Sequence, residues 1–152
     1  MLLLSQHCTL SLVKAQRRRI DGFYARCLRR VLGIPHSFYS RVSNKTVLER
    51  AGTIPLTDQL AQQQLILLGL VARSPAGDPL RRNTFIGDSL QPQICHYVRK
   101  VGRPRTNWTE SVLQEGVSRF GGLPAFVKMI CGKSKEEWKA VLNQMFAKPA
   151  AS

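Results

Sequence analysis

The chain has 152 residues, of which 43% are hydrophobic, so it holds enough apolar side chains for one ordinary domain core and is too short for a polymerase or a multidomain enzyme. Lysine and arginine number 23 against 9 acidic residues, which gives a net charge of +14. An excess of this size repels itself unless a polyanion neutralises it. It favours a nucleic-acid partner over a protein that is charged only for solubility or for attraction to a membrane surface.

The N-terminal region predicts one long helix over residues 12–32. Apolar residues recur at three- and four-residue steps and form one stripe along it, made of Ile20, Phe23, Cys27 and Val31. Gly33 is the expected C-cap, and Pro35 prevents continuation. Six arginines crowd the remaining surface, with Asp21 as their only acidic neighbour. We interpret this surface as a phosphate-tracking face rather than as an ordinary solvated face.

Two further helices follow before residue 74. Ser43 is the expected N-cap of a helix over 44–51, and Thr57 is the expected N-cap of a longer helix that ends at Arg73. The segment 65–72 is apolar on nearly every side, which predicts a central position in the core. Gly69 within it would allow another helix to approach closely.

Residues 74–101 are broken repeatedly by proline and glycine, so we expect an irregular segment that holds at most a hairpin or a single helical turn. After Trp108 the helical pattern returns, first to about Arg119 and then over 124–131. Ser134 and Glu137 form a capping box for a last helix over 135–146. The apolar face of that helix consists of Trp138, Val141, Leu142 and Met145.

No two-residue alternation of strand length occurs, so the expected fold is all-α, a small bundle of about five to six helices with an irregular central loop. The scattered positions of the cysteines lack the short spacing of a zinc site, and we expect buried, reduced thiols, no metal and no cofactor at Cys8, Cys27, Cys95 and Cys131. The longest apolar run is far shorter than the roughly 20 residues of a membrane helix, so we expect no membrane partner.

A stiff basic segment occupies residues 102–105, with the sequence Gly-Arg-Pro-Arg. Pro104 lacks a backbone donor and pushes Arg103 toward an extended conformation, so two guanidinium groups are presented on a short extended stretch. Such a presentation suits phosphate or groove contact, and Trp108 follows where it can anchor the segment to a core. The Gly-Arg-Pro tripeptide is also the centre of AT-hook motifs, although Val101 stands where the hook usually has arginine.

The arrangement of acidic and nucleophilic residues does not predict catalysis. Phosphoryl or nucleotidyl transfer needs carboxylates that hold two metal ions, but the only adjacent acids, Glu136 and Glu137, are explained by capping and the helix dipole. A phosphate-binding Gly-x-x-x-x-Gly-Lys loop and a Gly-x-Ser-x-Gly elbow are both missing. We therefore expect that the chain is not an enzyme on its own.

Four segments, in order, resemble the C-terminal region of non-LTR (LINE-type) retrotransposon reverse transcriptases. The family's Thr-Trp-x-Leu-x-Lys stretch and the Arg-Arg-Leu-Asp-x-Phe-x-x-Arg-Cys-Leu-Arg-x-Ile-Leu-Gly-Ile helix that follows it are matched within residues 9–34, and its Val-Ser-Asn and Val-Leu-Glu-Arg-Ala-Gly within 42–52. Its Leu-Gly-His-Val-x-Arg is similar to 68–73, and its Gly-Arg-Pro-Arg-x-x-Trp to 102–108. The departures include Leu70 in place of histidine, Leu10 in place of tryptophan and Cys8 in place of a common glutamate.

The resemblance implies a truncated fragment, because the family's endonuclease and the palm with its catalytic aspartates lie upstream of the matched region. It also accounts for residues 9–34 as family sequence, so we expect a nuclear or cytoplasmic location rather than a mitochondrial presequence. The implied organisation is a thumb-like basic helical segment, an irregular linker, a Gly-Arg-Pro-Arg loop with C-terminal helices, and a disordered tail, at residues 1–73, 74–101, 102–147 and 148–152.

The function that follows is that of a non-catalytic remnant that binds the RNA or DNA backbone with little sequence specificity and takes no small-molecule substrate. The candidate phosphate-contacting residues are Arg17, Arg18, Arg26, Arg29, Arg30, Arg103 and Arg105. Three alternatives stay open: an accessory part of a reverse transcriptase assembled with a separate palm, an AT-hook-like DNA-binding module, and an open reading frame without function.

Overall fold

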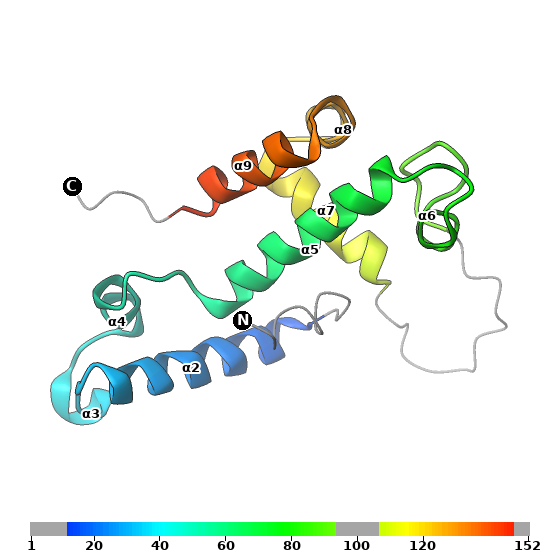
Figure 1. The fold of residues 1–152 in the computed structure, drawn as a ribbon. Helices are drawn as coiled ribbons and strands as arrows, with labels where there is room; N and C mark the ends of the chain where they lie inside the picture. Colours follow the sequence, from blue (N-terminus) through cyan, green and yellow to red (C-terminus); the bar gives the residue numbers. More distant parts are fainter. Residues whose placement is uncertain (1–11, 94–106, 148–152) are drawn as a thin grey trace, which may run out of the picture.

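The structure, a computed structural model, describes residues 12–93 and 107–147 and is all-α, as expected from the sequence. The described ranges contain eight helices, somewhat more than the five to six predicted. In chain order (Figure 1) these are α2 (Lys14–Val31), α3 (Ser37–Ser40), α4 (Asn44–Arg50), α5 (Leu56–Arg73), α6 (Pro79–Thr84), α7 (Trp108–Phe120), α8 (Leu123–Gly132) and α9 (Lys135–Met145).

Helices α5 to α9, which we call the bundle, enclose the hydrophobic core. Helix α5 runs through its centre, as the apolar segment 65–72 predicts, and α6, α7, α8 and α9 all pack against it. The core side chains come from α5, α7, α8 and α9 and from the residues that follow α6 and α9; the largest fully buried ones are Trp138, Phe85, Phe126, Leu65, Leu68, Ile130 and Leu142. This core includes residues on both sides of the segment boundary expected at residue 73, because α5 belongs to the same core as the C-terminal helices.

Trp138 of α9 occupies the middle of this core. Its side chain is fully buried, its indole Nε1 donates a hydrogen bond to the carbonyl oxygen of Leu65 at 3.0 Å, and its ring stacks on that of Phe120 at 5.5 Å between centroids. The close approach is possible because α5 has Gly69 here: a Cβ atom at that position would lie 2.4 Å from the indole nitrogen of Trp138. The expected helix contact at Gly69 is thus confirmed.

Helices α2, α3 and α4, which we call the arm, lie outside that core. Helix α2 lies alongside α5, and α3 and α4 lie at the C-terminal end of α2 (Figure 1). Only two apolar residues of the arm are buried, Ala25 and Val47. The arm therefore has no core of aromatic and large aliphatic side chains of its own.

The apolar stripe predicted along the first helix does not form a packing face. Phe23 is 59% exposed and Val31 is 82% exposed, while Ile20 and Cys27 are half-buried. The buried apolar residue of α2 is instead the small Ala25, and Asp21 and Arg29 of the same helix form hydrogen bonds to neighbouring segments. Phe23 and Val31 of the predicted stripe remain accessible to solvent.

Several local predictions are confirmed and one is wrong. The capping box of Ser134 and Glu137 is present at the start of α9, and Gly33 ends α2 with a φ of +64°. Thr57 is not the N-cap of α5, because the N-cap is Pro55, two residues earlier. The described part of the segment after residue 74 contains the short helix α6 and a single bridge between Phe85 and Pro92, where the sequence allows a hairpin or a single helical turn.

A candidate nucleic-acid interface on the arm

Arg29 is an internal residue of the arm, so the prediction that it lies on an exposed phosphate-binding face is wrong. Its exposed fraction is 5%, and its guanidinium donates hydrogen bonds to the carbonyl oxygens of Pro35 and Val42, to Ser40 Oγ and to Asn44 Oδ1. These contacts fasten the end of α2 to the turn before α3 and to the start of α4. All four acceptors are neutral, so no carboxylate among them compensates the positive charge of Arg29.

Arg17 is also committed to the fold. Its Nη1 lies 3.6 Å from a carboxylate oxygen of Glu115 on α7, and its Nε donates to the carbonyl oxygen of Leu12. Because its side chain keeps 38% exposure, the ion pair is a weak one that surrounding water screens. Arg17 therefore contributes to the joint between arm and bundle, and only partly to the exposed basic surface.

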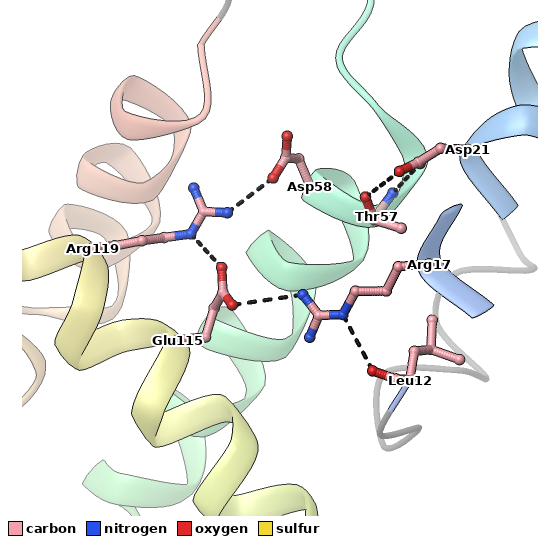
Figure 2. A network of polar contacts seen from close by, with 7 residues as sticks. All are labelled: Leu12, Arg17, Asp21, Thr57, Asp58, Glu115 and Arg119. Carbon is pink, nitrogen blue, oxygen red and sulfur yellow. Dashed lines mark hydrogen bonds and ion pairs between the residues drawn. The ribbon is translucent and has the colours of Figure 1, made fainter. Parts of the chain in front are cut away.

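The joint itself is a polar network that links α2, α5 and α7 (Figure 2). Asp21 of α2 accepts hydrogen bonds from the backbone nitrogen of Thr57 at 3.0 Å and from its hydroxyl at 2.7 Å. Those two contacts satisfy a free amide in the first turn of α5, so Asp21 caps a helix that is distant in sequence. The only acidic residue among the arginines of α2 is thereby turned toward α5.

On the other side of α5 the network centres on Arg119. Its guanidinium contacts Glu115 at 2.7 Å and Asp58 at 2.9 Å, and lies 4.3 Å from the centre of the Phe146 ring (Figure 2 shows the two carboxylates). Burial by itself would lower the pKa of Arg119, but the hydrogen bonds to Glu115 and Asp58 outweigh burial and raise the pKa above its ordinary value. Arg119 thus ties α5, α7 and the end of α9 together.

Two more arginines form hydrogen bonds within the bundle, and the sequence patterns did not indicate this role. Arg73 donates to the carbonyl oxygen of Ile130 at 2.8 Å, and burial lowers its pKa, against an opposing influence of Cys131 and Glu136. Arg81 is buried and donates to the carbonyl oxygens of Ala72 and Asp88. Both satisfy carbonyl groups at helix ends or turns. The contact of Arg73 is distant in sequence, whereas the contacts of Arg81 lie within nine residues.

The remaining arginines of α2 are exposed. Arg19, Arg26 and Arg30 follow one another at seven- and four-residue steps, which places them on one face of the helix together with Phe23. Arg18 is exposed on a neighbouring side. Within residues 12–93 and 107–147, none of these four arginines has an acidic partner within ion-pair distance. The other two candidates, Arg103 and Arg105, lie outside the described residues.

A surface groove of about 470 Å³ runs beside this row. Ile34 and His36 contribute from the turn after α2, and the helix contributes Phe23, Arg26, Cys27, Arg29 and Arg30. The groove thus combines an aromatic residue and aliphatic atoms with two exposed arginines, Arg26 and Arg30, above the buried Arg29. A second depression lies along α7, and its lining among the described residues consists of Asn107, Glu110, Ser111, Gln114, Glu115 and Ser118. Those residues include two carboxylates and no basic side chain, in contrast to the groove on the arm.

Charge is distributed unequally between the two regions. Residues 12–51 contain ten basic and two acidic residues, whereas the described part of residues 56–147 contains eight basic and seven acidic ones. The arm therefore holds most of the excess positive charge of the described chain. A polyanion approaching the molecule is attracted to the arm and gains little from the bundle.

Other classes of site are not evident in the part of the chain that the structure describes. No group of three or more histidine, cysteine, aspartate or glutamate side chains is close enough to hold a metal ion there. Of the cysteines in that part, Cys27 and Cys131 are unpaired thiols; Cys27 is half-buried and Cys131 is exposed, so the expectation that they are buried is wrong. Cys8 and Cys95 lie outside the described residues. None of the described helices combines the length and the hydropathy needed to cross a bilayer.

Comparison with known proteins adds no relative. No family model matches the chain, and neither a curated protein nor a solved structure is significantly similar to it.

Proposed function

We propose that this chain is a non-catalytic nucleic-acid-binding protein that contacts the RNA or DNA backbone through the arm, with little sequence specificity. The observation that carries the proposal is the exposed row of Arg19, Arg26 and Arg30, which has no acidic partner among the described residues. Guanidinium groups in such a row can each contact a phosphate and release a condensed counterion. The contacts would be to phosphates, which all sequences share.

The rest of the arm supports this proposal. The two acidic residues of residues 12–51 are Asp21 and Glu49, and Asp21 is engaged with α5 on the far side of the helix. The buried charge of Arg29, with its neutral acceptors, adds to the positive potential beneath the row. The basic surface is thus backed by an additional positive charge.

The origin that we propose is the thumb and post-thumb region of a non-LTR retrotransposon reverse transcriptase, on the strength of the four ordered motifs in residues 9–108. In that setting the arm would hold template or target strands for a palm on another chain segment. A primer-extension assay tests this origin, with the chain alone and with an intact element protein. Extension by the chain alone would contradict its non-catalytic role.

The binding proposal is tested by replacing Arg19, Arg26 and Arg30 together with glutamine and measuring affinity for a labelled oligonucleotide at several salt concentrations. Loss of three phosphate contacts should weaken binding and reduce the slope of log affinity against log salt by about 2 on a single strand. The matched control replaces the exposed bundle residues Lys128, Lys135 and Lys139 with glutamine, which removes the same charge.

The control should leave both affinity and salt slope nearly unchanged. If the arm variant and the bundle variant lose affinity equally, the interaction reflects net charge alone and the arm is not the binding surface. An affinity of the unmodified chain that does not depend on salt would also contradict the proposal.

A further inference from the structure

We propose that the groove beside Phe23 receives an unstacked base of single-stranded RNA or DNA, while Arg26 and Arg30 contact the phosphates of the same strand. This inference rests on the proposed function and specifies which form of nucleic acid the arm selects. An excess of positive charge alone does not account for this mode of binding, because the uncharged side chain of Phe23 has a separate role in it. Three features of the groove support it.

The first feature is the position of Phe23 among the arginines. Phe23 precedes Arg26 by three residues and Arg30 by seven, so the three side chains share one helix face, and Phe23 is 59% exposed. An exposed aromatic ring flanked by guanidinium groups is the combination that single-strand-binding proteins use, since bases stack on the ring and cations follow the backbone. A paired duplex turns its phosphates outward and keeps its base faces covered, so it has no group to place on Phe23.

The second feature is the mixed lining of the groove. Cys27 and Ile34 add apolar surface beside Phe23, and Arg26, Arg29 and Arg30 supply positive charge. A nucleotide has the same division, with an apolar ring face joined to a charged phosphate. The volume of about 470 Å³ is within the range of roughly 300–1,000 Å³ that is usual for small-ligand clefts. An uncharged apolar peptide would not match the guanidinium groups, and an acidic peptide would leave Phe23 without a stacking partner.

The third feature is the orientation of His36 at the end of the groove. His36 is the N-cap of α3, and its Nδ1 accepts a hydrogen bond from the backbone nitrogen of Phe38 at 3.2 Å. In a neutral imidazole this leaves Nε2 as the protonated nitrogen, which provides a donor for a base or phosphate oxygen. The groove therefore offers a stacking surface, guanidinium groups and an imidazole whose Nε2 is not used by the Phe38 hydrogen bond.

The test uses the full chain and one mixed-sequence oligonucleotide in three forms: single-stranded, duplex, and an abasic single strand of the same length. The Phe23→Ala variant should bind the single strand about tenfold more weakly, which is the usual scale of losing one stacked base. Its affinity for the duplex and for the abasic strand should be unchanged. Phe38→Ala is the matched control, because Phe38 is an aromatic residue of the arm that is 66% exposed and lies outside the groove lining.

A second variant, Phe23→Trp, gives a signal that a purely structural role would not produce. It should retain single-strand affinity, and the fluorescence of the introduced indole should be quenched by the single strand and not by the abasic strand. Trp108 and Trp138 are present in all variants, so the unmodified chain supplies the background signal.

The inference is overturned if Phe23→Ala weakens the binding of abasic and natural strands equally, or if it weakens the binding of neither. It is also overturned if Phe23→Ala has no effect and polyglutamate displaces the bound single strand as effectively as the abasic strand does. In those cases the salt dependence and the arginine variants would still support backbone binding. If the unmodified chain binds none of the three forms, both the inference and the proposed function are wrong.

Discussion

The arm and the bundle are both helical, but different forces hold them. The bundle is built around Trp138, Phe126 and Leu65, which are fully buried, and its basic and acidic residues nearly balance. The arm buries only Ala25 and Val47 among its apolar residues, and it is fixed by hydrogen bonds from Arg29 and to Asp21. Hydrophobic burial therefore stabilises one region, while polar contacts hold the other and leave its basic and aromatic side chains accessible.

This difference has a functional meaning. A surface that binds a polyanion needs uncompensated cations, which repel one another, so it is better carried by a part of the molecule that does not have to supply the core. Arg29 shows how the arm is stabilised without losing positive charge, because its acceptors are neutral oxygens rather than carboxylates. The following predictions test the comparison, in order of decreasing effect.

The largest effect is expected for Trp138→Ala in the bundle. Removing a fully buried indole and its hydrogen bond to Leu65 should lower the free energy of unfolding by about 3–5 kcal/mol, measured by urea denaturation. Leu123→Ala is the control, since Leu123 belongs to the same region and is 54% exposed. A loss at Trp138 no larger than the loss at Leu123 would contradict the central position of Trp138.

A smaller and local effect is expected for Arg29→Ala in the arm. The four acceptors that Arg29 now satisfies would lose their donor, and the stability of the arm should fall by about 2–3 kcal/mol. Hydrogen exchange should show faster exchange of amides in α3 and α4 and little change in α5 and α9. The neighbouring Arg30→Ala is the matched control, and it should leave exchange unchanged because Arg30 is exposed. Equal exchange in both variants would mean that Arg29 does not hold the arm.

The smallest effects on stability come from replacing glycine with alanine, and they have opposite signs in the two regions. Gly69→Ala should destabilise the bundle by about 1–3 kcal/mol, since the new Cβ atom would lie 2.4 Å from the Trp138 indole nitrogen. Gly22→Ala in α2 should stabilise the chain by about 0.5–1 kcal/mol, because no atom lies within 4 Å of the added Cβ and alanine favours the helix. Thermal denaturation of both variants measures the two changes in stability. If both substitutions change the stability in the same direction, this contrast between arm and bundle does not exist.

Many features of the fold were predictable because their signals are local. The capping box at Ser134 depends on two side chains three residues apart, and the buried segment 65–72 is evident from its continuous apolar character. Helix ends marked by Gly33 and Gly52 also follow from local backbone preference, since both have a positive φ. Among the candidate site residues, the exposed positions of Arg26 and Arg30 agree with the basic face expected on α2.

Other features were not predictable because they depend on which side of a helix becomes covered. Periodicity indicated an apolar stripe through Phe23 and Val31, but both remain exposed, and the apolar residue that α2 buries is the small Ala25. The N-terminus of α5 is capped by Asp21, which is 36 residues from Thr57 in sequence and cannot be inferred from a local pattern.

The sequence by itself determined that this protein is helical, strongly basic, and organised around a buried apolar segment, because composition and short-range periodicity carry that information. Only the tertiary structure decided what each arginine does. Arg29 and Arg30 are adjacent in the chain and identical in chemistry, but one is enclosed by neutral oxygens and the other is exposed. The physical reason is that the fate of a charged side chain depends on the acceptors that distant segments bring to it, and these are set by packing rather than by the neighbouring residues.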